Sequence, residues 1–511
     1  MFTRILLTLL LAGCGQMERN PETLVLVQWG GSTNLDPAAF VHTGDLMIIS
    51  EVYERLVSEI MPEGNPSGTF EGELAESWLV SEDGRTLTFH LYNNHFFDDG
   101  GRVDAQAVKW SFERLKEVNR VAAQRLAWID EVEVIDDLTI RLQSKEPFAA
   151  ALTSLAYTSS VVMNPATASQ FNTSVEFNQW MSEHSAGSGP YRIKSWQRGE
   201  RLVLKPNPHF HDQLPYFKKV VIKNLPDPSA RRIQLRKGDV DFTQTIASTN
   251  AHYYESLNGI KLYNYPTQIQ PGLWVVNTRK PALADARVRQ AIAYGINYEG
   301  LIEGVLDGKA QRLNSLMPRG VVGFVPDLLN YNYDPQRARE LLTEAGYPDG
   351  LDLRLLIGVL GPVAETLQSF MADIGIRLSL EIVASATFFD RISSGDFDIA
   401  HTSDFMDFLD PWAILRPLYH SSAIDNATNM AFYSNPEVDR LLDIGDTAIL
   451  PADRSRAYAQ AQTIIANEIP YIYLFSGNLI FAARDEIKGI DVSPSLGYRL
   501  NIHKMYRDSV E

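Results

Sequence analysis

The chain has 511 residues, 45% of them hydrophobic and 21% charged, so it is long enough for more than one domain with a large buried core. Its formal net charge is −17, and no segment is rich in Lys and Arg. These features exclude an ordinary nucleic-acid-binding protein, and the acidity bears on solubility and ligand steering instead.

The N-terminal segment MFTRILLTLLLAGC predicts a lipoprotein signal peptide over residues 1–13. Arg4 precedes the apolar run Ile5–Leu11, which is too short to span a bilayer and leads to a small-residue cleavage site. Cys14, the single cysteine, follows that site and matches the bacterial lipobox, in which the cysteine is acylated. We therefore expect a soluble protein without disulfides, tethered to a membrane in the periplasm or at the cell surface. Gly15 leaves open which membrane holds the anchor, and the alternative is an uncleaved leader with an incidental cysteine.

Alternating hydrophobic residues predict strands at 86–92 and 218–225. Residues 351–358 and 376–383 alternate in the same way, and the segment between them, 362–375, has the apolar spacing of a helix. A strand–helix–strand unit favours parallel pairing with a right-handed crossover. The chain is therefore expected to have an α/β fold.

Two later helices carry start and stop signals in the sequence. Asp334 is a predicted N-cap followed by Pro335, and Gly346 is expected to end that helix. The same device recurs with Asn435 as the cap and Gly445 as the expected end.

Familiar catalytic motifs are missing from the sequence. It contains no G-x-S-x-G elbow, no H-E-x-x-H, no Walker loop and no G-x-G-x-x-G, and its one cysteine is assigned to lipid. His209 and His211 form the only close histidine pair. We interpret them as part of a surface turn, with metal ligation as the alternative. The sequence thus predicts no catalytic residue, no cofactor and no metal site.

The stretch HTSDFMDFLDPW, residues 401–412, places three aspartates among apolar residues. Burying a carboxylate there is costly unless a positive group meets it. The spacing of Asp404, Asp407 and Asp410 lacks the Gly and the final Glu of a calcium loop. Asp410 directly precedes Pro411, which predicts an N-cap with proline at the first helical position.

Several phrases together resemble the peptide- and nickel-type solute-binding proteins of ABC importers, family 5 of the extracellular solute-binding proteins. The resemblance rests on an LAESW phrase with a hairpin and an F-x-DG turn, a GSGPY strand, a VRQA helix and two further helical phrases. These stretches occur in the family's order and cover residues 72–115, 187–212, 287–302, 331–350 and 435–445.

This resemblance implies a two-lobed α/β fold of the periplasmic-binding-protein type (type II, cluster C), with an extra domain on the first lobe. Lobe I would comprise 21–67, 187–268 and 484–511, the extra domain 68–186, and lobe II 269–483. The hinge would be formed by the chain crossings near 268 and 484. Closure of such lobes traps the ligand in a dry cleft.

The resemblance also assigns ligand-binding residues. In some members, the α-amino group of a peptide is bound by an aspartate. That aspartate lies nine residues after the Asp of a Phe-Asp motif and four residues before a proline. Here the phrase is Phe397-Asp398 and the proline is Pro411, so the matching residue is Asp407. Its alternative role is to pair with a nearby Arg or Lys. Asp404 stands where many peptide-binding members have tryptophan, and it is a second candidate.

Other cleft residues are expected in both lobes. Val41, His42 and Thr43 match the segment that lines the cleft in related proteins. Trp274 is a candidate aromatic wall, with a core tryptophan on a buried strand as the alternative. No residue matches a binding group for a peptide carboxylate, and Arg354 would fit that role only through a forced alignment.

The sequence thus predicts a lipid-anchored, monomeric substrate-binding component of an ABC importer, without catalysis, that delivers peptides to permease subunits in the inner membrane. Another small solute, such as a sugar conjugate or a metal chelate, is the alternative ligand. A secreted hydrolase that uses Asp404 and Asp407 as acid and base is the rival from another class. A binding protein that reports to a receptor or assists folding is a third possibility.

Overall fold

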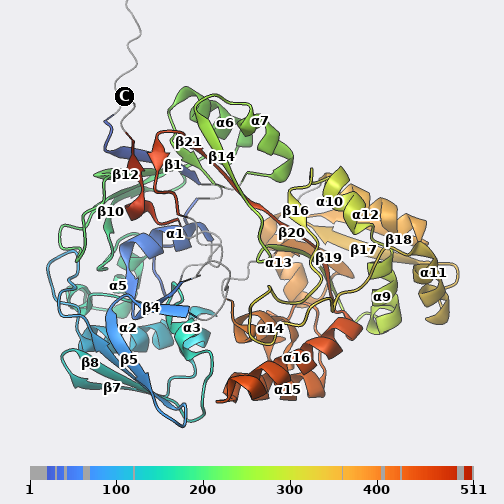
Figure 1. Cartoon of the computed structure of the whole chain (residues 1–511), viewed down its shortest axis with the longest axis horizontal. Coiled ribbons are helices and arrows are strands. Elements are labelled where there is room, and N and C mark those ends of the chain that lie inside the picture. The colour runs from blue at the N-terminus through green and yellow to red at the C-terminus, as the bar shows by residue number, and fades with distance from the viewer. Residues whose placement is uncertain are drawn as a thin grey trace, which may run out of the picture.

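The computed structural model describes residues 20–28, 31–39, 43–60, 69–118, 121–244, 246–358, 361–403, 409–425, 428–491 and 500–508. The chain forms two α/β lobes, and an extra domain is attached to the first of them (Figure 1). Among the described residues, no helix combines the length and apolar character that crossing a membrane requires.

Lobe I is built on a seven-stranded sheet. Its strands, in spatial order, are β10 (Tyr191–Gln197), β11 (Arg201–Pro206), β12 (Lys219–Asn224), β1 (Thr23–Gln28), β13 (Phe242–Thr243), β21 (Leu479–Arg484) and β14 (Ile260–Tyr265). Central β1 pairs in parallel with both β12 and β13. Leu24 and Leu26 of β1 face one core, while Val25 and Val27 face another. The helices over the first face are α1 (Thr43–Val52) and α5 (Ser174–Met181), and those over the second are α6 (Pro228–Lys237) and α7 (Ala251–Glu255).

The extra domain has an antiparallel sheet with its own core. Its strands are β5 (Ala75–Val80), β6 (Thr86–Leu91), β8 (Thr139–Gln143) and β7 (Glu131–Asp136), and they pack against α2 (Ala105–Val118). The predicted strand at 86–92 is confirmed as β6, with Leu87, Phe89 and Leu91 buried. Two short ribbons join this domain to lobe I, namely β2 (Glu54–Arg55) with β9 (Val161–Val162) and β3 (Val57–Ile60) with β4 (Thr69–Gly72).

Lobe II contains a six-stranded sheet covered on both faces. Its order is β16 (Ala310–Gln311), β20 (Tyr471–Gly477), β15 (Pro271–Val276), β19 (Ile399–Ser403), β17 (Leu351–Ile357) and β18 (Ile376–Ile382). One face carries α9 (Ala286–Tyr294), α10 (Tyr298–Gly304), α11 (Pro335–Glu344) and α12 (Pro362–Asp373). The other carries α13 (Ser385–Ser394), α14 (Pro411–Tyr419), α15 (Pro436–Thr447) and α16 (Pro451–Glu468). The predicted strand–helix–strand unit is confirmed, because β17 and β18 pair in parallel on either side of α12 in the sequence.

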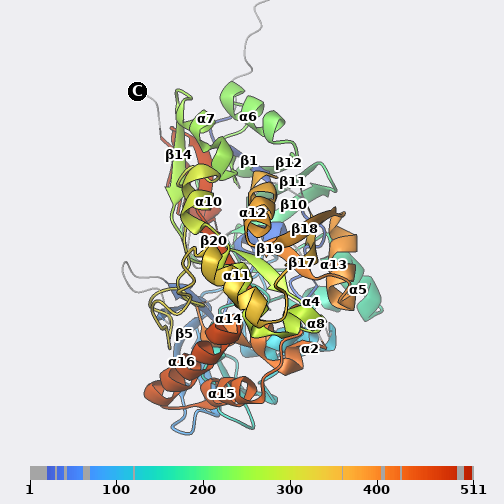
Figure 2. The same ribbon diagram turned by 90° about the vertical axis from the view of Figure 1, so that its right-hand side faces the viewer.

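Short elements complete the described part of the chain. They are α3 (Ala151–Leu155), α4 (Pro165–Ala168), α8 (Pro281–Ala284), β22 (Ile487–Lys488) and β23 (Tyr506–Arg507). Figure 2 shows the molecule from the side of lobe II, with α15 and α16 at the end opposite to α6 and α7.

Two chain crossings connect the lobes, and one of them differs from the prediction. The first runs between β14 and β15 and includes residue 268, as expected. The second lies at Asn478, because β20 belongs to the sheet of lobe II whereas β21 pairs with β14 in lobe I. The boundary predicted at 484 is therefore wrong by six residues. The run YIYLFSGNLIFAAR is apolar on both sides of the crossing, so hydrophobic pattern alone does not divide it.

The start signals of both predicted helices are confirmed, and one of the two stop signals is wrong. The carboxylate of Asp334 accepts a hydrogen bond from the backbone N–H of Arg337 at the start of α11, and Gly346 adopts a left-handed φ of 95° just beyond its end. Asn435 likewise caps α15, but that helix continues through Gly445 to Thr447. A Cβ at Gly445 would lie 2.6 Å from the ring of Tyr458 in α16. This glycine therefore permits close helix packing instead of ending the helix.

Candidate functional site

The fold places the ends of the parallel strands on the inner side of each lobe. In lobe I, β1 ends at Gln28, and α1 begins at Thr43 after the loop that follows β1. In lobe II, β19 ends at Ser403, and α14 begins at Pro411. Helices α1 and α14 lie on the sides of their lobes that face each other (Figure 1). Ligands of open α/β sheets bind beyond the carboxyl ends of parallel strands, so these two loops are the expected walls of the site.

Most of the predicted ligand residues lie in these loops and outside the described residues. Asp404 and Asp407 follow β19, and Val41 and His42 precede α1. Thr43 is the first residue of α1, and its side chain is also outside the description. Cys14, the predicted lipidation site, is likewise outside it. The roles assigned to all six residues stay predictions.

Gln28 brings an uncommitted amide to the inner edge of lobe I. Its side chain is 5% exposed, and its Nε2 has no hydrogen-bond partner among the described residues. Gly44 allows α1 to approach it closely, because a Cβ at this position would lie 2.1 Å from Gln28 Nε2. In the same region, the carboxylate of Asp45 accepts the backbone N–H of Thr33 at 3.1 Å. A buried donor without a partner at a strand end is suited to the backbone carbonyl of a ligand.

Asp410 has the structural role that the sequence predicts. Its carboxylate accepts the N–H of Trp412 at 2.9 Å, and Pro411 is the first residue of α14, so the N-cap is confirmed. The structure adds a partner from α16, since Arg454 Nη2 donates to both carboxylate oxygens at 2.8 and 2.9 Å. Both side chains are about nine-tenths buried. Asp410 thus fixes the end of the loop that carries Asp404 and Asp407.

A second group of charges lies at the start of β19, at the opposite end of the strand from that loop. Asp398, the acid of the Phe397-Asp398 phrase, accepts hydrogen bonds from the backbone N–H of Arg354 at 3.0 Å and from its Nε at 3.3 Å. The same guanidinium contacts Asp396 at 3.1 Å. Arg354 is therefore held by acids of lobe II, in agreement with the view that it is not the binding group for a peptide carboxylate.

Trp274 lies in the core of lobe II and does not line a cleft. Its side chain is completely buried within β15, among residues of the sheet and of helices α9 to α12. Every residue of β15 is buried, which is typical of a central strand covered on both faces. The prediction that Trp274 forms an aromatic wall of the cleft is therefore wrong, and the alternative, a core tryptophan on a buried strand, is correct.

A cavity of about 760 Å³ lies between the extra domain and lobe II, beside the start of α14. Trp128 and Phe148 line it from the extra domain, and Trp412 lines it from lobe II. The rings of Phe148 and Trp412 meet edge to face at 5.2 Å, and the N–H of Ala149 donates to the carbonyl of Asp446 at 3.0 Å. The volume lies within the usual range for small-molecule sites, about 300–1,000 Å³. This cavity cannot be predicted from sequence patterns, because its walls come from segments almost 300 residues apart.

A known protein family matches most of the chain. The sequence profile described as "Bacterial extracellular solute-binding proteins, family 5 Middle" matches residues 69–426. The chain belongs to this family. Members are substrate-binding proteins of ABC importers, so both the predicted family and the predicted two-lobed fold are confirmed.

Individual relatives match this chain over most of its length. The "Probable D,D-dipeptide-binding periplasmic protein DdpA" of Escherichia coli K12 is 32% identical over 487 residues, which cover 95% of this chain and 94% of that protein. The periplasmic binding protein DppA from Helicobacter pylori, solved in complex with the peptide STSA, superposes with a TM-score of 0.82 at 25% identity, covering 95% of this chain and 98% of that one. A dipeptide-binding protein from Pseudoalteromonas, solved with Met-Leu, gives a TM-score of 0.84 at 23% identity, covering 95% of this chain and all of that one, and shows the shared fold.

Proposed function

We propose that this protein captures peptides in the cleft between its lobes and delivers them to the permease of an ABC importer, without chemical change. The observation that carries the proposal is the 32% identity over 95% of the chain to a probable D,D-dipeptide-binding protein. The peptide-bound relative from Helicobacter pylori supports the same ligand class. The protein would work as a monomer outside the cytoplasm.

The residues around the cleft support a peptide ligand in physical terms. A peptide offers a backbone that can pair with polar groups at strand ends, such as Gln28 Nε2, which has no hydrogen-bond partner among the described residues. Asp407 would accept its α-ammonium group in a charge-assisted hydrogen bond. The N-cap of Asp410, which directly follows the loop of Asp407, would hold that end of the loop against lobe II.

The ligand class is tested by releasing what the protein carries. Protein purified under native conditions is denatured, and the released small molecules are identified by mass spectrometry. We expect short peptides, and calorimetric titration of ligand-free protein with a D,D-dipeptide and its L,L isomer then defines the stereochemical preference. A sugar conjugate or a metal chelate as the released species, with no binding of either dipeptide, would contradict the proposal.

The lipid anchor is tested at Cys14. Acylation requires its thiol, so Cys14→Ser is expected to shift the protein from the detergent phase to the aqueous phase in a partition assay, or to leave it unprocessed. A variant that partitions like the parent would show that the protein is not anchored through this residue.

A further inference from the structure

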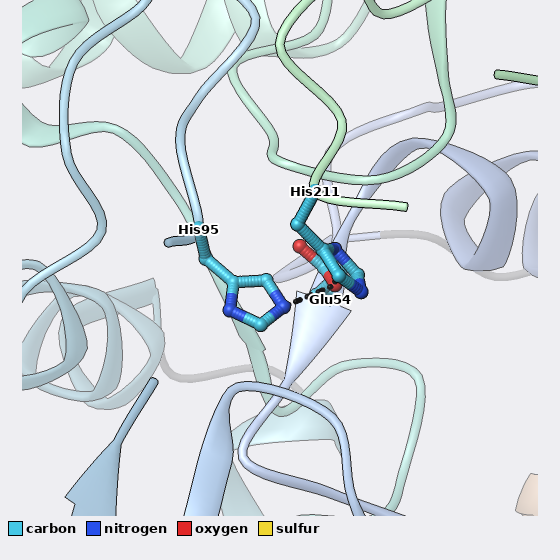
Figure 3. Close-up of side chains that lie close together, drawn as sticks. All are labelled: Glu54, His95 and His211. Carbon is cyan, nitrogen blue, oxygen red and sulfur yellow. Dashed lines mark ion pairs between the residues drawn. The ribbon is translucent and has the colours of Figure 1, made fainter. Parts of the chain in front are cut away.

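Three side chains with metal-binding atoms converge where the extra domain meets lobe I. Glu54 stands on β2 directly after α1, His95 follows β6 in the extra domain, and His211 follows β11 in lobe I. Figure 3 shows both imidazole rings beside the carboxylate of Glu54. One ligand atom from each residue can be chosen so that all three lie within 4.8 Å of one another.

The buried members of this cluster lack hydrogen bonds. Glu54 and His95 are each 3% exposed, and neither Glu54 Oε2 nor either ring nitrogen of His95 has a hydrogen-bond partner among the described residues. Leaving such atoms unpaired in the interior is costly, and buried polar side chains are nearly always satisfied. The cluster is thus incomplete without a further group.

Burial also sets the charges that a cation would meet. It lowers the pKa of His95 to about 3 and lowers that of His211, which favours the neutral imidazole, the form that binds metal. Burial, followed by the nearby Glu73, raises the pKa of Glu54 well above its usual value. A bound cation would reverse that effect by stabilising the carboxylate.

The distances from the two histidines to Glu54 Oε1 are those expected around a small cation. Zinc ligands lie ~2.0–2.2 Å from the ion, so two of them in tetrahedral positions are ~3.4 Å apart. His211 Nδ1 lies 3.4 Å from Glu54 Oε1, and His95 Nε2 lies 3.6 Å from the same oxygen. These separations are too long for good hydrogen bonds and close to the spacing of ligands around one ion.

We propose that Glu54, His95 and His211 bind a divalent transition-metal ion of the zinc class. Two imidazoles and one carboxylate form a donor set that suits zinc better than it suits magnesium or calcium. The coordination would be completed by water, because Glu54 and His211 also line a polar cavity of about 450 Å³. That cavity provides the path by which the ion enters.

The ion would join two domains that are otherwise linked by short ribbons. Glu54 and His211 belong to lobe I, whereas His95 belongs to the extra domain, so one ion crosses the boundary between them. The neighbouring acid Glu73 is held by Arg55 at 2.6 Å and leaves Glu54 as the carboxylate closest to the histidines. Glu54 follows the end of α1, whereas Thr43 of the proposed peptide cleft begins that helix, so the role of the ion would be structural.

Zinc binding to the full-length mature protein, freed of any affinity tag and stripped with chelator, tests this site. We expect calorimetric titration with a zinc salt to show one ion per chain with micromolar or tighter affinity, and zinc to raise the melting temperature. Glu54→Gln and His211→Ala should each lower the affinity by about tenfold or more, since even partners that only support a ligand are worth 10–100-fold. Cobalt added in place of zinc should give the intense visible absorption of a four-coordinate site in the parent only.

The matched control is His209→Ala, because His209 is two residues from His211 but exposed and outside the cluster. It should bind zinc as the parent does. His211 is partly exposed, so its replacement tests the site even if Glu54→Gln fails to fold. Weak binding with no defined stoichiometry, equal affinity in the parent and in His211→Ala, or loss of binding in His209→Ala alone would overturn the proposal.

Discussion

Two buried polar clusters, one in each half of the molecule, differ in how their hydrogen bonds are made. In lobe II, Asp410 accepts from Trp412 and Arg454, and Asp446 accepts from Arg416 at 2.5 Å and from Tyr458 at 2.6 Å. At the junction of lobe I and the extra domain, by contrast, the cluster of Glu54, His95 and His211 contains buried atoms without partners among the described residues.

The contrast separates a structural role from a ligand-binding role. Each carboxylate of the lobe II cluster is already matched by protein donors, so that cluster can hold α14, α15 and α16 together without any added group. In the other cluster, Glu54 Oε2 and both ring nitrogens of His95 are similarly buried but have no hydrogen-bond partner within the described ranges of the chain. Buried polar groups without partners are the stronger sign of a binding site.

The largest expected effect on stability comes from breaking the buried ion pair between Asp410 and Arg454. Arg454→Met should lower the free energy of unfolding by about 3–5 kcal/mol, because it leaves the Asp410 carboxylate buried beside an uncharged side chain. Urea denaturation measures this loss. Arg456→Met is the control, since Arg456 is 67% exposed and pairs with Asp453 on the surface, where such pairs are worth about 0–1 kcal/mol. Equal losses in the two variants would remove the distinction between buried and exposed pairs.

The second largest expected effect is a pH dependence of the free energy of unfolding that comes from Asp446. Burial, opposed mainly by Arg416, raises its pKa from 3.8 to about 6. Protonation is thus favoured in the folded state, so its contribution to stability is complete below pH 3.8 and is lost as the pH rises through 6. A shift of about two pKa units corresponds to ~3 kcal/mol. Asp446→Asn should remove this dependence from denaturation curves recorded between pH 4 and pH 7, and a variant with the parent's pH dependence would contradict the assignment.

The smallest effect is expected in the unmatched cluster. In the presence of chelator, Glu54→Gln should change the free energy of unfolding by no more than ~1 kcal/mol, because burial already favours the uncharged carboxyl, which the glutamine amide resembles in size and polarity. Chemical denaturation in chelator measures it. A loss as large as that of Arg454→Met would mean that the Glu54 carboxylate already has a partner that holds it.

The sequence predicts local features of this protein better than distant ones. The N-cap of Asp410 is visible because the cap and the N–H it accepts are two residues apart, and alternation reveals β17 and β18. Arg454 is 44 residues away from Asp410, so nothing in the sequence pairs them. The family resemblance supplied the two lobes but not the exact crossing at Asn478, where the apolar pattern continues across the boundary.

The histidines illustrate the same limit. His209 and His211 invite attention because they are close in sequence, and the surface-turn interpretation suits the exposed His209. The atoms that meet His211 belong to Glu54 and His95, which are more than 100 residues before it. The prediction of no metal site rested on motif spacing, whereas the metal site proposed above takes its three donors from distant parts of the sequence.

We propose that Asp407 holds the peptide through its α-ammonium group. Asp407→Asn keeps the size of the side chain and removes its charge, and truncating one partner of a buried charged pair costs about 2–5 kcal/mol. Calorimetric titration of the parent and the variant, each with a free-amine peptide and its N-acetylated analogue, isolates this contact, with Asp404→Asn as the neighbouring control. The account predicts a loss of affinity of roughly tenfold or more for the free-amine peptide and a far smaller loss for the acetylated one. Equal losses for both peptides would contradict it.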